Sequence, residues 1–112
     1  LTMRYCIDID GCICTNTRGK YDEAEPYQLF IMRVNMLFDE GHHIMLFTAR
    51  GTTTGIDWRD VTVEQLTRWG VKYHELVFGK PEYDVIVDDK SMSLDDFVSQ
   101  ELEMPDHTRS KV

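Results

Sequence analysis

Two close pairs of aspartates in this 112-residue chain each follow an apolar run. Asp8 and Asp10 end the run M-R-Y-C-I-D-I-D, and Asp88 and Asp89 follow Y-D-V-I-V. Residues i and i+2 of a strand point to the same face, so Asp8 and Asp10 would bracket one substrate atom. An ionised carboxylate attacks phosphorus, while a second carboxyl group carries a proton to the leaving oxygen. The first pair therefore predicts chemistry at a phosphoryl group.

The second acidic pair predicts a metal ion, because so much negative charge at one place repels itself without a hard cation. A ligand set of oxygen atoms alone favours Mg²⁺, which would also screen a phosphate dianion from an attacking carboxylate. The hydroxyl of Thr48 and the ammonium group of Lys80 would stabilise the non-bridging phosphate oxygens. Gly11 would let the backbone approach the phosphate closely. Taken singly, each of these residues is more often a turn, cap, strand or surface residue, so the joint occurrence carries the prediction.

The hydrophobic pattern predicts the elements that must position these residues. Strands are expected over residues 3–10, 43–49, 71–78 and 83–87, and helices over 26–40, 58–69 and 94–102, with an exposed loop or flap over 15–25. This alternation indicates an α/β fold: one doubly wound, Rossmann-like parallel sheet with helices on both faces. Ligands of such sheets bind beyond the carboxyl ends of the strands, where the candidate site residues should converge.

Two helical patterns allow more than one interpretation. Leu29, Met32 and Met36 form a second apolar line on the first expected helix, either as general core or as a subunit interface. Thr62 and Gln65 would form a capping box if the second helix begins late. Neither alternative is decided by the sequence.

Composition predicts one folded domain over residues 1–112, with a polar tail at 104–112 and with Leu1 and Thr2 as leftover residues before a natural start at Met3. Twelve Lys and Arg against twenty Asp and Glu give a net charge of −8, which disfavours nucleic acid and anionic membranes as partners. The chain lacks both a signal peptide and an apolar stretch of about 20 residues, so a cytoplasmic protein is expected. The cysteines are too few and too closely spaced for a disulfide framework or a zinc signature, and buried or half-buried thiols are expected. They are Cys6, Cys12 and Cys14.

The segments D-I-D-G-C-I, L-F-T-A-R, F-G-K-P and I-V-D-D-K together resemble the four motifs of the haloacid dehalogenase superfamily of phosphatases, in the same order. The resemblance covers nearly the whole chain up to about Ser93. It implies that Asp8 is the nucleophile and Asp10 the acid/base, and that Thr48 and Lys80 bind phosphate. It also implies Mg²⁺ held by the Asp8 carboxylate, the Asp10 backbone carbonyl and Asp88, with support from Asp89. The carboxylate of Asp10 favours the phosphatase branch over the dehalogenases, although Cys12 stands where many relatives have threonine.

The intervals between the motifs are too short for a cap domain, so the chain resembles a capless family member. A second subunit or the substrate itself would then cover the open site, which makes a homo-oligomer an expectation. Gly11, Ala49 and Arg50 are the expected substrate contacts, joined by Arg18 or Lys20 of the flap, and solvated surface charge is the alternative for these basic residues. Similar small members occur in bacterial surface-polysaccharide pathways. The expected function is therefore Mg²⁺-dependent hydrolysis of a phosphomonoester, such as a sugar or polyol phosphate, through an aspartyl-phosphate.

Two other functions remain open. Receiver modules of signalling proteins also place acids, a Thr and a Lys at the carboxyl edge of a parallel sheet, but their paired acids come first in the chain and here a pair comes last. The second alternative is an inactive binding protein that keeps the fold.

Overall fold

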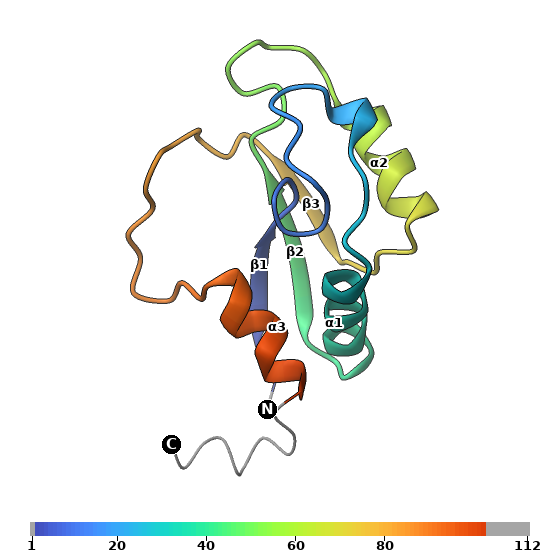
Figure 1. Ribbon diagram of the computed structural model, residues 1–112, viewed down its shortest axis with the longest axis vertical. Helices are drawn as coiled ribbons and strands as arrows, with labels where there is room; N and C mark the ends of the chain where they lie inside the picture. Colours follow the sequence, from blue (N-terminus) through green and yellow to red (C-terminus); the bar gives the residue numbers. More distant parts are fainter. Residues whose placement is uncertain (1, 103–112) are drawn as a thin grey trace.

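The structure is built on a three-stranded parallel sheet with the strand order β1-β2-β3. The computed structural model describes residues 2–102. Along the chain its elements are β1 (Arg4–Asp8), η1 (Tyr21–Glu23), α1 (Gln28–Asp39), β2 (His43–Thr48), α2 (Arg59–Arg68), β3 (Glu75–Phe78) and α3 (Leu94–Leu102) (Figure 1). In the sheet register Arg4 lies opposite His43, and Met45 lies opposite Glu75. The expected α/β fold with a parallel sheet is confirmed.

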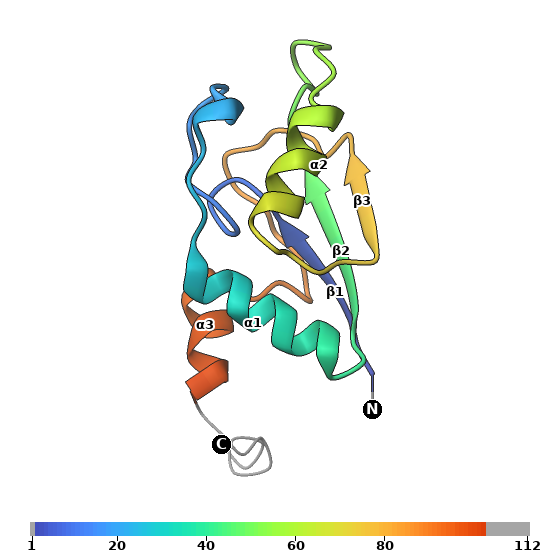
Figure 2. The same ribbon diagram turned by 90° about the vertical axis from the view of Figure 1, so that its right-hand side faces the viewer.

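The sheet of residues 2–102 is wound in one direction, and the second half of the expected doubly wound sheet is not formed among these residues. The connection through α1 leads from β1 to its neighbour β2, and the connection through α2 leads onward in the same direction to β3. Right-handed crossovers in one direction place both helices on the same face of the sheet. Figure 2 shows α1, α2 and α3 gathered on one side of the three strands. Burial along β2 accordingly alternates, with Ile44, Leu46 and Thr48 buried and the intervening side chains partly exposed. Helices on both faces would have buried the whole strand.

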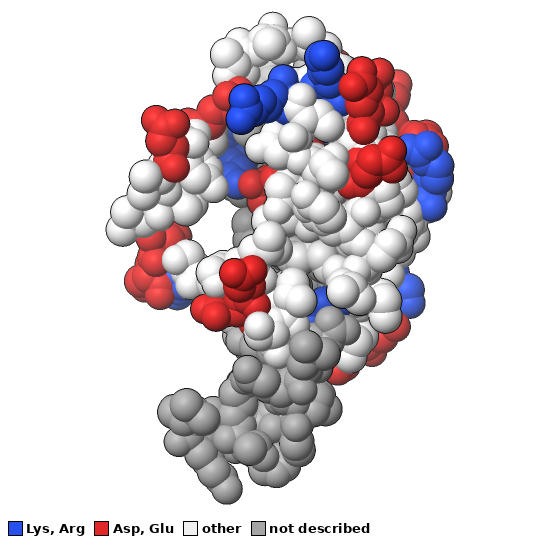
Figure 3. Space-filling model, in the orientation of Figure 1, with Lys and Arg blue, Asp and Glu red and all other residues white. Residues whose placement is uncertain are grey.

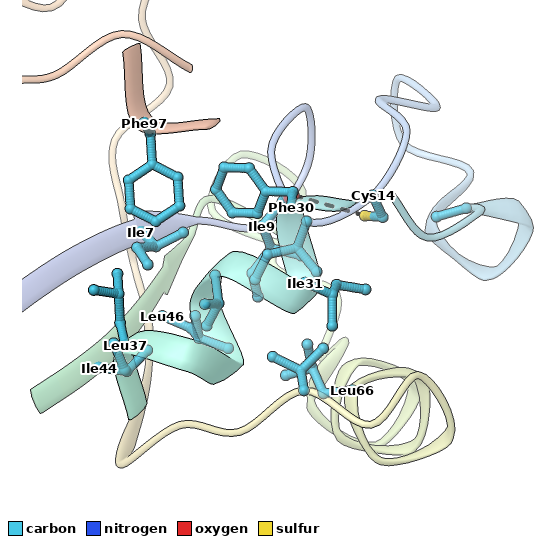
Figure 4. Close-up of a cluster of buried hydrophobic side chains, with 14 residues drawn as sticks. Ile7, Ile9, Cys14, Phe30, Ile31, Leu37, Ile44, Leu46, Leu66 and Phe97 are labelled. Atoms are coloured by element: carbon cyan, nitrogen blue, oxygen red, sulfur yellow. Dashed lines mark hydrogen bonds between the residues drawn. The ribbon is translucent and has the colours of Figure 1, made fainter. Parts of the chain in front are cut away.

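The hydrophobic core lies between that face of the sheet and the helices (Figure 4). Ile44 and Leu46 of β2 are fully buried beside Val34 and Leu37 of α1. Phe97 joins α3 to α1, because its ring centroid lies 4.9 Å from that of Phe30. This packing holds the strands in place and leaves the carboxyl edge of the sheet free for loops.

The expected helices are confirmed within two residues at their ends. Helix α1 stops before Gly41, which has φ +97°, a backbone conformation that glycine adopts at helix C-termini without strain. The second apolar line of α1 is not core: Leu29, Met32 and Met36 are 67%, 53% and 37% exposed. The core interpretation of that line is therefore wrong, and the subunit interface stays a prediction.

The expected fourth strand over residues 83–87 is not formed, and residues 81–93 run as an exposed segment without strand or helix. Val85, Ile86 and Val87 are 77%, 56% and 92% exposed. Figure 1 shows this segment arching away from β1, and Figure 3 shows an open gap between it and the body of the molecule. A parallel strand needs a crossover of roughly a dozen residues or more, but only residues 79–82 separate β3 from the expected strand at 83–87. The connection is thus too short for the topology that the sequence pattern suggested.

No helix among residues 2–102 has the length and apolar character needed to span a bilayer. The polar tail expected at 104–112 and the first of the two expected leftover residues, Leu1, lie outside the described residues.

Candidate active site

Asp8 and Lys80 meet at the carboxyl edge of the sheet. Asp8 is the last residue of β1, and Lys80 follows β3 by two residues. The Lys80 backbone N–H donates to the Thr48 carbonyl at 3.1 Å, which continues the pairing of β2 with β3 and directs the lysine toward β1. The Lys80 Nζ lies 2.7 Å from Asp8 Oδ2, and the Ile9 N–H donates to Asp8 Oδ1 at 2.8 Å. A carboxylate and an ammonium group from distant parts of the sequence are therefore in direct contact.

The environment keeps Lys80 charged. Its side chain is 11% exposed, against 34% for the Asp8 side chain, so the ion pair is reached by water mainly from the Asp8 side. Burial by itself lowers the pKa of Lys80, but hydrogen bonds to Asp8 and Tyr83 and the charge of Asp8 outweigh it and leave that pKa above its ordinary value. Lys80 Nζ also lies 5.0 Å from the ring centroid of Tyr83. The result is a fixed cation that can attract a phosphate dianion.

Asp10 does not share this cation; it is held by Arg50. The Arg50 Nε donates to Asp10 Oδ2 and the Arg50 Nη2 to Asp10 Oδ1, both at 2.9 Å. The pair is bidentate, a geometry that fixes a carboxylate in orientation as well as position. Asp10 lies past the end of β1, in an isolated bridge to Cys14. The expected strand through Asp10 thus ends at Asp8, and each carboxylate is paired with its own basic residue.

Arg50 is buried and does not contact solvent as a substrate-binding or surface residue would. It is 2% exposed, and its Nη1 donates to Thr62 Oγ1 at 3.0 Å and to Gln65 Oε1 at 2.7 Å. The Tyr21 ring covers the guanidinium at 4.8 Å. These contacts use the donors of Arg50 within the protein, so its expected contact with substrate is not seen in this arrangement.

Thr62 and Gln65 bind Arg50, a role that no sequence motif predicted. They lie inside α2, which begins at Arg59, so they form no capping box, and both side chains are buried. Their signal in the sequence was a polar i, i+3 pair beside Leu66, on the helix face that otherwise points inward. Such a pair on a buried face requires polar partners, and Arg50 is that partner.

The remaining candidates for contact with phosphate or substrate are Thr48, Gly11 and Ala49. Thr48 is fully buried, and its Oγ1 accepts a hydrogen bond from the Arg50 N–H at 3.1 Å. Gly11 has φ +88° and donates its N–H to the Cys14 carbonyl at 2.8 Å, so this glycine serves the turn after β1. The carbonyl of Ala49 accepts from the Thr52 N–H at 2.9 Å. Thr48 is the last residue of β2, whereas Gly11 and Ala49 belong to the loops that follow β1 and β2.

Asp88 and Asp89 are not brought to this edge as metal ligands. Both are exposed in the segment 81–93, and Asp88 Oδ1 accepts the Lys90 N–H of its own turn at 2.7 Å. Among residues 2–102, no three His, Cys, Asp or Glu side chains gather where they could hold a metal ion. Because Asp8 and Asp10 are already paired with basic groups, the described arrangement does not fit the expected Mg²⁺ site, which stays a prediction.

Cys12 and Cys14 are unsuited to nucleophilic chemistry, whereas Cys6 is exposed and not buried or half-buried as expected. Burial raises the pKa of Cys14 to about 12, helped by the charge of Asp10, and burial with the charge of Asp8 raises the pKa of Cys12 to about 11. A thiol attacks as its thiolate, which is scarce at neutral pH for both residues. Cys14 instead packs in the core with its Sγ 3.7 Å from the Ile9 carbonyl, as expected for a buried thiol (Figure 4).

No model of a known protein family matches the sequence, and no curated protein matches it. Among solved structures, the chain is similar to a structural-genomics target from Vibrio cholerae, with a TM-score of 0.79 and 23% sequence identity over 88% of this chain and 89% of that one. It is also similar to one chain each of a Pnkp1/Rnl/Hen1 complex and of a Pnkp1/Rnl/Hen1 RNA repair complex, at TM-scores of 0.55 and 0.54 and identities of 19% and 20%. The matches span 92% and 90% of this chain but only 34% and 30% of those two. At these identities the likenesses support the α/β fold.

Proposed function

We propose that this chain is a phosphomonoester hydrolase in which Asp8 is the nucleophile. The observation that carries the proposal is the contact between Asp8 Oδ2 and Lys80 Nζ, 2.7 Å apart at the carboxyl edge of a parallel sheet. A phosphate ester bound at Lys80 would have its phosphorus next to a carboxylate oxygen, and the lysine would offset the repulsion between the two anions. The resemblance to the haloacid dehalogenase phosphatases supports the same roles.

The reaction would run in two steps. An oxygen of Asp8 attacks phosphorus and the bond from phosphorus to the leaving oxygen breaks, which gives an aspartyl-phosphate and an alcohol once that oxygen takes a proton. Water then attacks the phosphorus, and inorganic phosphate and the Asp8 carboxylate are released. Asp10 remains the candidate for the proton transfers. A protonated Asp10 would still have one unprotonated oxygen to accept from Arg50, so acid catalysis would cost it only part of the bidentate contact.

The substrate we propose is a small phosphorylated metabolite such as a sugar or polyol phosphate. The net charge of −8 disfavours a polyanionic substrate, although one of the structurally similar chains belongs to an RNA repair complex. Basic side chains are found near the site all the same: Arg18 and Lys20 are exposed in the flap between β1 and α1, and Figure 3 shows Lys and Arg side chains toward that end of the molecule. These side chains could donate hydrogen bonds to the polar groups that a phosphate ester carries beyond its phosphate.

The proposal is tested by hydrolysis of a generic aryl phosphate, measured with and without added Mg²⁺ so that the predicted cation dependence is tested as well. We expect Asp8→Asn to abolish turnover and Lys80→Met to reduce it strongly, because the nucleophile and the phosphate-binding cation are lost. Asp39→Asn is the matched control, since Asp39 is a surface acid whose contact is with Lys72. Acid quenching during turnover, followed by peptide mass mapping, should place one phosphoryl group on Asp8. Undiminished turnover by Asp8→Asn would overturn the assignment, and a stable aspartyl-phosphate without turnover would favour a receiver-like module.

A further inference from the structure

Gln65 joins two parts of the molecule that the proposed reaction requires to be near each other. It lies in the middle of α2, is 1% exposed, and uses both ends of its side-chain amide. Its Oε1 accepts from Arg50 Nη1 at 2.7 Å, and its Nε2 donates to the backbone carbonyl of Tyr21 at 2.6 Å. One side chain thus connects the Arg50–Asp10 pair to the flap.

The flap, residues 15–25, is a loop closed at its base. The Thr15 N–H donates to the Glu25 carbonyl at 2.9 Å, and the Glu25 N–H donates to Thr15 Oγ1 at 3.0 Å. The bridges from Cys14 to Asp10 and to Pro26 place this base beside the end of β1. Figure 2 shows the flap rising from there past the strand ends, next to α2.

Beyond its base, the described flap is attached to the body of the protein around Tyr21. The ring of Tyr21 lies over Arg50 and meets Trp58 edge to face at 5.0 Å, while its carbonyl accepts the Gln65 hydrogen bond. Arg18 and Lys20 are exposed on the same short loop. The position of these two basic residues therefore depends on how firmly Tyr21 is held.

We propose that Gln65 is a positioning residue that ties the flap to the Arg50–Asp10 pair. The Gln65 amide meets two demands with separate atoms, because Arg50 requires an acceptor and the Tyr21 carbonyl requires a donor. A glutamate would satisfy Arg50 but would face the carbonyl with another acceptor. The role of this tie, which is to hold the flap over a bound phosphate ester, rests on the proposed function. The hydrogen bonds of Gln65 themselves require no substrate.

Limited proteolysis with trypsin tests the tie directly, because trypsin cleaves after Arg18 and Lys20 in the flap. We expect cleavage at these two bonds to become roughly tenfold faster in Gln65→Glu and in Gln65→Met, since a buried hydrogen bond that holds the flap is lost. Thr62→Val is the matched control: it removes the other neutral acceptor of Arg50 from the same helix face but leaves the Tyr21 bond intact. Its flap cleavage should stay within about twofold of wild type.

Cleavage after Lys90 is the internal reference, because Lys90 lies in the exposed segment 81–93, apart from the flap. Thermal melting of each variant confirms that the cleaved protein is folded. Flap cleavage that stays at the wild-type rate in folded Gln65→Glu and Gln65→Met would overturn the tie. Parallel acceleration at Lys90 would also overturn it, since the change would then be a general loosening.

Kinetics separate this inference from the proposed function. If the wild-type protein hydrolyses phosphate esters, Gln65→Glu should raise KM for a sugar phosphate severalfold and leave KM for a minimal aryl phosphate nearly unchanged, because only the sugar reaches the flap. Equal changes for both esters would contradict the positioning role. If the wild-type protein hydrolyses no phosphate ester, the proposed function fails, whereas proteolysis still decides whether Gln65 holds the flap.

Discussion

Replacing Arg50 by Met should destabilise the protein by about 3 kcal/mol. The side chain of Arg50 is fully buried, and its loss leaves Asp10 Oδ2, the Thr62 hydroxyl and the Gln65 amide oxygen without the Arg50 donor. Asp10 Oδ1 keeps only the weak donor Cys14 Sγ at 3.6 Å. Breaking a buried ion pair from one side costs roughly 3–5 kcal/mol. The Asp10 side chain is 16% exposed, so water can partly solvate the stranded carboxylate, and the lower end of that range is expected.

Urea unfolding followed by the fluorescence of Trp58 and Trp69 measures this loss, since both residues flank α2. For a slope of about 2 kcal/mol per molar urea, a 3 kcal/mol loss lowers the midpoint by about 1.5 M. Arg50→Lys should fall between wild type and Arg50→Met, because an ammonium group keeps the charge but not the two parallel hydrogen bonds. Arg68→Met is the control, because Arg68 is exposed and forms a surface ion pair with Glu64 at 3.5 Å. This substitution should change the free energy of unfolding by less than about 0.5 kcal/mol. An Arg50→Met protein within about 1 kcal/mol of wild type would refute the reasoning.

Gly51→Ala should cost clearly more stability than Gly55→Ala, because a Cβ at residue 51 would lie 2.1 Å from the Ile56 carbonyl oxygen whereas one at residue 55 meets nothing within 4 Å. Both glycines have positive φ, so the backbone strain is shared and only the clash differs; equal losses in thermal melting would contradict the close approach. Alkylation with iodoacetamide at pH 8 should modify exposed Cys6 first and Cys12 and Cys14 far more slowly, since pKa values of about 11 and about 12 keep the two inner thiols protonated. The rate at Cys12 should rise with pH toward about 11 as its thiolate forms, and rapid labelling of Cys14 in folded protein, read by peptide mass mapping, would show that its burial is wrong.

Local features of the sequence predicted the helices well. The apolar spacing of α1 and the glycine that follows it are short-range signals, and the structure places the helix end where the glycine indicated. The positions of Asp8 and Lys80 next to strand ends followed from the same kind of reasoning, because a parallel sheet brings all carboxyl ends to one edge.

Features that depend on long-range packing could not be predicted in this way. The segment 83–87 has the composition of a strand, but the length of its connection to β3 decides whether it can join a parallel sheet. The burial of Arg50 depends on partners 40, 12 and 15 residues away in sequence, namely Asp10, Thr62 and Gln65. No motif contains all of these residues, so the sequence predicted a solvent-facing arginine where the structure has a buried one.

The strand register has a consequence for how the chain folds. Arg4 pairs with His43 and Met45 with Glu75, so no strand of the sheet has its partner nearby in sequence. Each pairing must close a loop that contains a whole helix, and the entropy lost in that closure precedes any gain from the pairing. During synthesis the first strand therefore has no neighbour until the ribosome has added α1 and β2. Folding should accordingly be slower than that of a helical bundle of equal size, with α1 and α2 formed before the sheet that they cover.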